Sequence, residues 1–260
     1  MHHSDSQALG EFLLEEVKVC GARVLFGTQV TSVKRRADST VSYLIARTVS
    51  GDGPANFEIP CDSILIAAGP WSASVFADLY PTAELKVPIR AHTGSYSLLL
   101  ALHSDDDRRR WVQWRNKSVV LRRPGQPSVQ FMMRTDGLVH AATAPSPPLE
   151  LGSSADNTNA RLDEIEMRQI EKDAQALLSL PSQVRLRRAC FNPVTISDLP
   201  ILSQVPKSLH AVHTADPNVY ILGGHGYWGI TASLGSGKLM AQLLLGEEVD
   251  LDLAAFCIPR

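Results

Sequence analysis

The sequence has 260 residues, of which 44% are hydrophobic, so it can bury a sizeable core. A formal net charge of −2 and a pI near 6.4 give no electrostatic basis for binding nucleic acid or an anionic membrane surface. No apolar run reaches the roughly 18 residues of a membrane span, and no signal-peptide core follows Met1. We therefore expect a cytoplasmic protein without a membrane span.

The N-terminal segment is predicted to form a helix that ends at Gly21. Its apolar residues fall on one helical face: Leu9, Phe12, Leu13, Val17 and Cys20. Short apolar runs at 23–26 and 29–33 predict two strands, and the alternation of Val41, Tyr43 and Ile45 predicts a third, half-buried one. We expect these strands to form a meander.

An apolar strand follows at 63–66 and ends in the small residues of Ala67-Ala68-Gly69-Pro70. From about 86 to 186 the pattern becomes a series of short strands, with Asp136-Gly137 as a hairpin turn signal. The expected strands are 95–100, 118–121, 129–133 and 138–142. Apolar residues spaced as on one face of a helix over 162–177 then predict an amphipathic helix.

The last third of the chain is the most informative part. The apolar run 219–222 reads as a buried strand, a glycine-rich turn follows at 223–229, and a helix is expected at 233–245. Glycines remove the Cβ atoms that keep a flat ligand away from the backbone. The start of the helix offers free N–H groups to electron-rich ligand atoms. The pattern fits a flavin-ring site, although such a turn also serves ordinary packing.

The order of several motifs makes the comparison specific. Ala-Ala-Gly-Pro-Trp-Ser at 67–72 is followed by Cys-Phe-Asn-Pro-Val-Thr at 190–195, Asp-Leu-Pro-Ile at 198–201 and Gly-His-Gly-Tyr-Trp-Gly-Ile at 224–230. In this order the motifs resemble the superfamily of FAD-dependent D-amino-acid oxidases, glycine oxidases and sarcosine oxidases. The resemblance extends from about Ser4 to Glu247 and implies FAD as the cofactor and a small amine or amino acid as the substrate.

One family element is missing from the sequence. Such enzymes hold the FAD pyrophosphate on a GxGxxG turn in an opening βαβ unit, and no GxGxxG occurs in these 260 residues. The resemblance thus implies the C-terminal part of the family fold. Either the sequence starts downstream of the true start, or the protein is naturally shorter.

The fold class expected from the resemblance is α/β (α+β), a portion of the GR2-type FAD-binding fold with an inserted antiparallel-sheet substrate domain. Residues 1–85 and 189–250 are assigned to the FAD-binding domain, and 86–188 to the substrate domain. The residues implied to contact FAD are Val30, Ala68, Gly69, Trp71, Gly223, Gly224, His225, Gly226, Tyr227, Trp228, Gly229 and Ile230. For Val30 the side chain can equally be plain core, and His225 can be a local hydrogen-bonding residue instead of a catalytic base.

The substrate contacts are less defined. Asn192 stands where many amino-acid oxidases of this type carry an arginine that binds the substrate carboxylate, and asparagine cannot make that charged bidentate pair. Arg90 and Arg134 are candidate replacements, or else surface and ion-pair arginines. Cys190 matches the cysteine that holds flavin covalently in sarcosine oxidases; a small buried apolar residue is the alternative.

Other chemistries find little support. Gly237-Lys238 ends like a phosphate-binding loop, yet the earlier glycine is replaced by Ala232 and the following Ser or Thr by Leu239. The four cysteines form no CxxC pair, and no HExxH or GxSxG motif occurs, so no metal site or serine-hydrolase triad is expected.

The sequence therefore predicts an FAD-dependent oxidoreductase that oxidises a C–N bond of an amine or amino acid by hydride transfer to flavin. The catalytic residues remain unassigned. A non-catalytic scaffold or trafficking protein, or a truncated remnant that keeps the oxidase fold, is the alternative.

Overall fold

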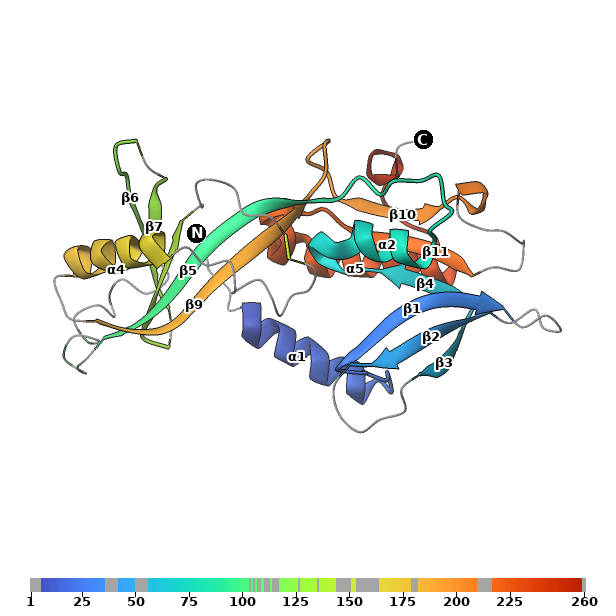
Figure 1. Cartoon of the computed structure of the whole chain (residues 1–260), viewed down its shortest axis with the longest axis horizontal. Coiled ribbons are helices and arrows are strands. Elements are labelled where there is room, and N and C mark those ends of the chain that lie inside the picture. The colour runs from blue at the N-terminus through green and yellow to red at the C-terminus, as the bar shows by residue number, and fades with distance from the viewer. Residues whose placement is uncertain are drawn as a thin grey trace. The chain divides into compact units, whose positions relative to one another are not determined.

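The structure is a computed structural model that describes residues 6–35, 42–49, 56–102, 104, 106, 109, 113, 117–125, 127–134, 136–143, 151–152, 164–178, 182–209 and 217–258. It mixes helices with three sheets, which confirms the α+β class (Figure 1). No helix in these ranges is both long enough and apolar enough to cross a membrane.

The chain divides into two compact units. One unit contains the described part of 91–192, and the other contains the described parts of 6–90 and 193–258. Strand β5 (Arg90–Leu102) and strand β9 (Ser182–Val194) carry the chain between them. These limits fall a few residues later along the chain than the predicted insertion of 86–188.

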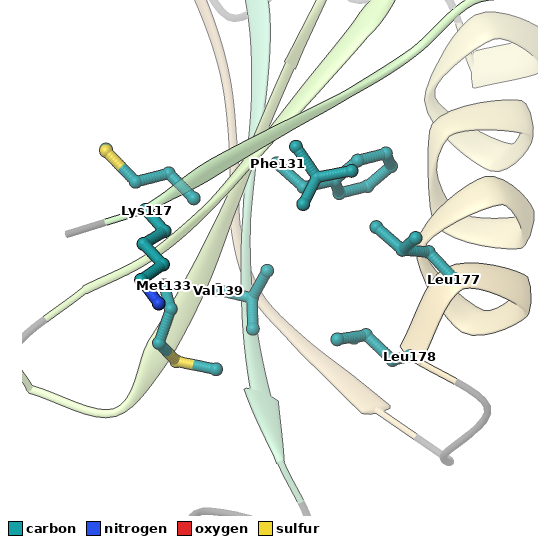
Figure 2. Close-up of a pocket in the computed structure, with 8 residues that line it drawn as sticks. Lys117, Phe131, Met133, Val139, Leu177 and Leu178 are labelled. Carbon is teal, nitrogen blue, oxygen red and sulfur yellow. The ribbon is translucent and has the colours of Figure 1, made fainter. Parts of the chain in front are cut away.

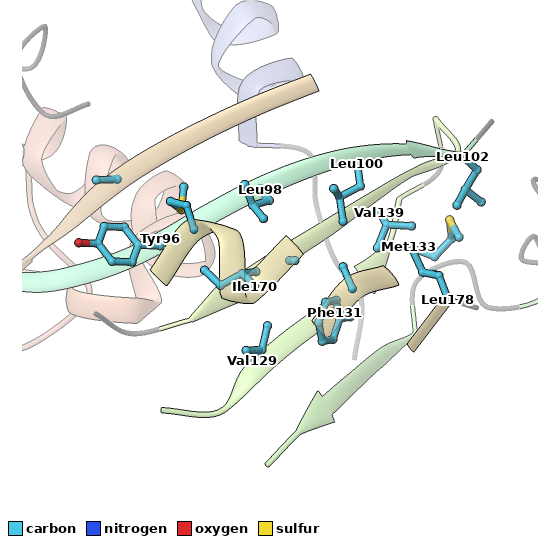
Figure 3. Close-up of a cluster of buried hydrophobic side chains, with 14 residues drawn as sticks. Tyr96, Leu98, Leu100, Leu102, Val129, Phe131, Met133, Val139, Ile170 and Leu178 are labelled. Atoms are coloured by element: carbon cyan, nitrogen blue, oxygen red, sulfur yellow. The ribbon is translucent and has the colours of Figure 1, made fainter. Parts of the chain in front are cut away.

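The unit of 91–192 is built on a five-stranded sheet in the order β6-β7-β8-β5-β9. The further strands are β6 (Ser118–Leu121), β7 (Val129–Met133) and β8 (Leu138–Thr143), and the helix is α4 (Glu164–Leu178). Alternate residues of the strands face the helix, and their side chains interlock with those of α4 (Figure 3). The unit thus has a closed hydrophobic core of its own, which includes Leu98, Phe131 and Ile170.

The other unit contains two three-stranded sheets. An antiparallel meander joins β1 (Thr28–Arg35), β2 (Ser42–Thr48) and β3 (Phe57–Cys61). The second sheet has the order β10-β11-β4, with β10 (Ile201–Val205), β11 (Asn218–Gly223) and β4 (Ser63–Ile66). The helices of this unit are α1 (Ser6–Val19), α2 (Ser72–Leu79) and α5 (Gly229–Leu245). The unit also has short 3-10 turns: η1 (Gly69–Trp71), η4 (Lys207–Leu209), η5 (Gly226–Trp228) and η6 (Ala254–Phe256).

Helices cover both faces of the second sheet. On one face, Phe76 and Leu79 of α2 join Ile64, Ile66 and Ile221 in a buried cluster. On the opposite face, Met240 of α5 packs with Leu202 and Tyr220 of the sheet. Because β4 and β11 run parallel, the turns that follow them emerge at the same edge.

Most predicted elements are confirmed, and the strands at 118–121 and 129–133 have the expected bounds. The strand predicted at 23–26 is wrong, since these residues form no strand and the side chains of Leu25 and Phe26 are exposed. A strand needs a hydrogen-bonded neighbour, and the described part of the chain supplies none there. Helix α5 begins at Gly229, earlier than predicted. Val41 and Leu162 lie outside the described residues.

Candidate functional site

Two glycine-containing turns lie side by side at the carboxyl edge of the parallel pair β4 and β11. Ile66, the last residue of β4, is paired with Ile221 of β11. Ala68 and Gly69 therefore lie just after one strand, and Gly223 ends the other, with Gly224 next in the chain. In open α/β sheets, ligands bind outside the carboxyl ends of the strands, so this edge is the candidate site.

The first turn leads directly into a helix. Gly69 has a φ of +56°, which glycine adopts without strain, and the N–H of Trp71 donates to the Ala68 carbonyl at 3.1 Å. The buried Ser72 hydroxyl donates to the Gly69 carbonyl at 2.8 Å and fixes the turn from within. No side chain caps the start of α2, and its first turn has no acidic residue.

The second turn is tightly packed against the side chains of Thr195 and Ile89. Gly224 has a φ of +81°, and a Cβ at this residue would lie only 2.6 Å from the Thr195 Cγ2 atom. A Cβ on Gly223 would lie 3.1 Å from the Ile89 Cδ1 atom. Gly226 also has a left-handed φ, of +55°. Glycine is required at Gly224 by both backbone conformation and space, and at Gly226 by backbone conformation.

His225 is held within this turn by several contacts. Its backbone forms an antiparallel bridge with Val194, and its carbonyl accepts the N–H of Trp228 at 3.0 Å. Its Nε2 atom shares a 2.9 Å hydrogen bond with the Oγ atom of buried Ser236 on α5. Partial burial lowers the pKa of His225 below its usual value, because desolvation disfavours the charged ring. The imidazole is therefore neutral near pH 7.

The two helix starts share an electrostatic property. Neither α2 nor α5 has a side-chain cap or an acidic residue in its first turn. Backbone N–H groups at such a start carry partial positive charge and bind electron-rich atoms.

The backbone of two glycines at this edge is open. A Cβ added at Gly69 or at Gly229 meets no atom within 4 Å, whereas the space beneath Gly223 and Gly224 is filled. Tyr227 and Trp228 expose 71% of their surfaces, which leaves two aromatic side chains beside the open backbone. Small residues, open backbone and uncapped N–H groups together fit the ring of a flavin.

Two other predicted residues belong to the same unit as the turns. Val30 packs as a partly buried side chain against the cluster that contains Ile66 and Ile221, and the register of β1 shifts just after it. Arg90 is exposed and directly follows Ile89, the residue that fills the space beneath Gly223.

Three predicted residues belong to the unit of 91–192. Arg134 forms an ion pair with Asp136 at 2.8 Å in the hairpin between β7 and β8. Partial burial raises the pKa of Asp136, but hydrogen bonds from Arg134 and from the Leu138 N–H outweigh it and hold the pKa below its usual value. Asn192 is half-buried and Cys190 is exposed, both in β9.

Sequence reasoning missed three residues that shape the second turn: Ile89, Thr195 and Ser236. Ile89 and Thr195 lie more than 25 residues from the glycines they support, so local patterns carry no signal for them. Ser236 could have been found, because it shares the inner face of α5 with Met240 and is the polar residue there.

A cavity in the unit of 91–192 does not compete with this site. Phe131, Met133 and Val139 line it from the sheet and Leu177 and Leu178 from α4 (Figure 2). Its free volume is about 20 Å³, room for about one water molecule. It is too small for a cofactor or a substrate.

Comparisons with known proteins identify the family of this chain. Residues 2–243 match the family DAO, described as FAD dependent oxidoreductase. The protein named "Putative oxidoreductase C1F5.03c" of Schizosaccharomyces pombe is 24% identical over 189 residues, which are 72% of this chain and 42% of that protein.

Solved structures show the same fold. Glycine oxidase from Geobacillus kaustophilus superposes with a TM-score of 0.59 at 17% identity over 90% of this chain and 52% of its own. L-amino acid deaminase from Proteus vulgaris gives 0.62 at 19% identity over 95% and 60%, and L-proline dehydrogenase from P. horikoshii gives 0.63 at 14% over 94% and 56%. The chain thus spans little more than half the length of these proteins. By its match over nearly the whole sequence, the chain belongs to the DAO family of FAD-dependent oxidoreductases.

Proposed function

We propose that this chain forms part of an enzyme that oxidises a C–N bond of a small amine or amino acid with FAD as the hydride acceptor. The observation that carries the proposal is the pair of uncapped glycine turns at the carboxyl edge of β4 and β11. The names of similar structures agree, since glycine oxidase, L-amino acid deaminase and L-proline dehydrogenase are named for amino acids.

The residues of this chain are assigned to contacts with the flavin ring and its surroundings. The backbone of Ala68 and Gly69 and that of residues 223–230 would contact the ring, with Trp71 and Tyr227 packed beside it. Val30 is assigned to the adenine end. When bound, FAD supplies the acceptor for the hydride, and the helix starts favour the negative charge that the ring gains.

His225 is assigned to positioning the turn. Its ring is neutral and hydrogen-bonded to Ser236, so it adds no positive charge beside the cofactor. It holds the turn against α5, so that the N–H groups keep a fixed direction.

For the substrate, Arg90 is the stronger candidate for binding a carboxylate. Its side chain is exposed, while the guanidinium of Arg134 is engaged by Asp136. Asn192 can offer only neutral hydrogen bonds. A covalent bond from Cys190 to the flavin is testable by acid precipitation, since flavin colour left in the supernatant would contradict it.

The first test is flavin binding. The purified protein is incubated with FAD, separated from free FAD by gel filtration, and examined for the visible flavin band. Gly229→Leu is the informative variant, because its Cβ meets no protein atom but the side chain would occupy the proposed ring position. Gly235→Leu is the matched control on the same helix, where a Cβ also meets nothing.

We expect bound flavin in the unchanged protein and in Gly235→Leu, and at least about tenfold weaker binding in Gly229→Leu, the cost of about 1.4 kcal/mol. Equal binding by both variants contradicts the assigned ring position. Bleaching of the flavin band by an amine or amino acid without oxygen would then support C–N oxidation. A colourless protein would mean either that FAD binding requires the missing GxGxxG unit or that the function is not redox, as in the scaffold alternative.

A further inference from the structure

The loop of residues 195–200 joins β9 to β10, and both of its ends contact the second turn. Before the loop, Val194 forms an antiparallel bridge with His225. After the loop, Ile201 is paired in register with Gly223. The backbone of the second turn is thus paired with both ends of the same loop.

The side chain of Thr195 closes this loop. Its hydroxyl donates to the Leu199 carbonyl at 2.7 Å and shares a 3.3 Å hydrogen bond with the Ser197 hydroxyl. The Ser197 hydroxyl also accepts the Leu199 N–H at 3.4 Å. Because Thr195 is only 4% exposed, water has little access to replace the bond that its hydroxyl makes.

The closed loop contains a strained residue. Asp198 has a φ of +58°, and it is the one non-glycine residue with a positive φ in the part of the chain that the structure describes. Such a conformation persists only where the surrounding contacts hold it. The hydrogen bonds from Thr195 and Ser197 to Leu199 span Asp198 and supply those contacts. Without them, we expect Asp198 to relax.

The methyl group of Thr195 supports the second turn directly. Its Cγ2 atom lies 2.6 Å from the position that a Cβ on Gly224 would take, so it packs against the backbone of this glycine. One side chain therefore closes the loop with its hydroxyl and supports the turn with its methyl group. Because threonine is β-branched, a single χ1 angle fixes both groups.

We propose that Thr195 is a positioning residue for the second turn and acts by holding the loop of 195–200 closed. The hydroxyl fixes the loop, and the loop fixes the turn through Val194 and Ile201. The inference rests on the proposed function in one respect, since it takes this turn to contact the flavin ring. Donors held in a fixed direction favour the negative charge of the reduced ring without reorganisation.

The first test is amide hydrogen exchange in the protein without flavin. Thr195→Val keeps a β-branched side chain and removes only the hydroxyl. The Trp228 amide, which donates to the His225 carbonyl within the turn, should then exchange at least about fivefold faster, the factor equal to about 1 kcal/mol for one lost hydrogen bond. The coupling constant between the amide and α protons of Asp198 should also change, because it depends on φ.

Two further variants separate this role from general stability. Thr195→Ser keeps the hydroxyl, so it should retain the Asp198 coupling constant and exchange at Trp228 more slowly than Thr195→Val. Ser203→Ala is the matched control, because Ser203 is a buried residue of β10 whose hydroxyl donates to the Gln204 carbonyl at 3.0 Å. It should leave both measured quantities unchanged. Circular dichroism verifies that each variant folds.

The second test is the midpoint potential of bound flavin. The potential should fall in Thr195→Val, because misdirected N–H groups stabilise the reduced ring less, and it should be unchanged in Ser203→Ala. If the chain binds no flavin, that failure belongs to the proposed function, and the exchange measurement decides the role of Thr195 without cofactor.

Three results would overturn the proposal. The first is a Thr195→Val protein with a changed Asp198 coupling constant but unchanged exchange at Trp228, since the loop would then not act on the turn. The second is equal acceleration of exchange by Thr195→Val and Ser203→Ala. The third is an unchanged midpoint potential in Thr195→Val that has bound flavin.

Discussion

Helices α1 and α4 are nearly equal in length, with 14 and 15 residues, and both carry an apolar stripe. Helix α4 buries four residues of that stripe on the five-stranded sheet, and α1 buries none. Arg123, two residues after β6, also forms ion pairs with Glu166 and Asp173 of α4, whereas Lys18 of α1 pairs within its own helix with Glu15. An amphipathic pattern thus identifies the face that will be buried but says nothing of whether its partner is present.

The largest effect on stability should come from a substitution in α4, the helix that is packed on its sheet. Ile170 of α4 is fully buried, so Ile170→Ala should lower the free energy of unfolding by about 2–5 kcal/mol through lost contacts and a residual cavity. Phe12→Ala on α1 removes a larger side chain, yet it should change stability by only about 0.5 kcal/mol, because Phe12 is largely exposed. Urea denaturation measures both. Similar losses for the two variants would mean that α1 is packed in solution.

The same contrast explains what could be predicted from the sequence. Strands 118–121 and 129–133 were found at their observed bounds because their alternation and hairpin turn are local signals. The segment 23–26 has the composition of a strand but no strand beside it, and composition alone cannot show that. At the candidate site the glycines and His225 were predicted from their order in the chain. Thr195 and Ile89 beneath them were not, because their contacts depend on the fold.

The second turn belongs to the same unit as α1, but it is tightly packed, whereas α1 exposes its apolar residue Phe12. Gly224→Ala combines a left-handed φ with a 2.6 Å approach to Thr195 Cγ2, so it should cost about 2–3 kcal/mol of unfolding free energy. Adding Thr195→Ser removes that methyl group and should restore part of the loss. Gly235→Ala, in helix α5 with no atom near its Cβ, should instead stabilise by up to about 1 kcal/mol. Thermal unfolding of the variants checks these values. Equal stability of Gly224→Ala and the unchanged protein would contradict the packing described for the turn.

A smaller effect is expected at the contact between this turn and α5. Ser236→Ala leaves the Nε2 atom of the half-buried His225 without its partner, and should cost about 1 kcal/mol. Ser236→Thr keeps the hydroxyl and is the control for loss of the hydrogen bond. The NMR shifts of the His225 ring nitrogens should change in Ser236→Ala and remain close to their original values in Ser236→Thr. Unchanged shifts in both variants would mean that the hydrogen bond is not formed.

The smallest effect concerns pH and follows from the burial of His225. Its folded pKa lies below the ordinary value of about 6.5, so as the pH falls the unfolded chain takes up the proton first. The free energy of unfolding should therefore decrease as the pH is lowered from about 6.5 to the folded pKa. Above that pH window, His225 adds nothing to the pH dependence of the unfolding free energy. His225→Gln keeps a hydrogen-bonding side chain and removes the titration, so the difference in stability between the two proteins should be constant above pH 7 and shift in favour of the variant below pH 6.5. Denaturation at a series of pH values measures that difference. A pH-independent difference would mean that water reaches the His225 ring freely. The second turn would then be exposed to solvent, as helix α1 is, and not packed.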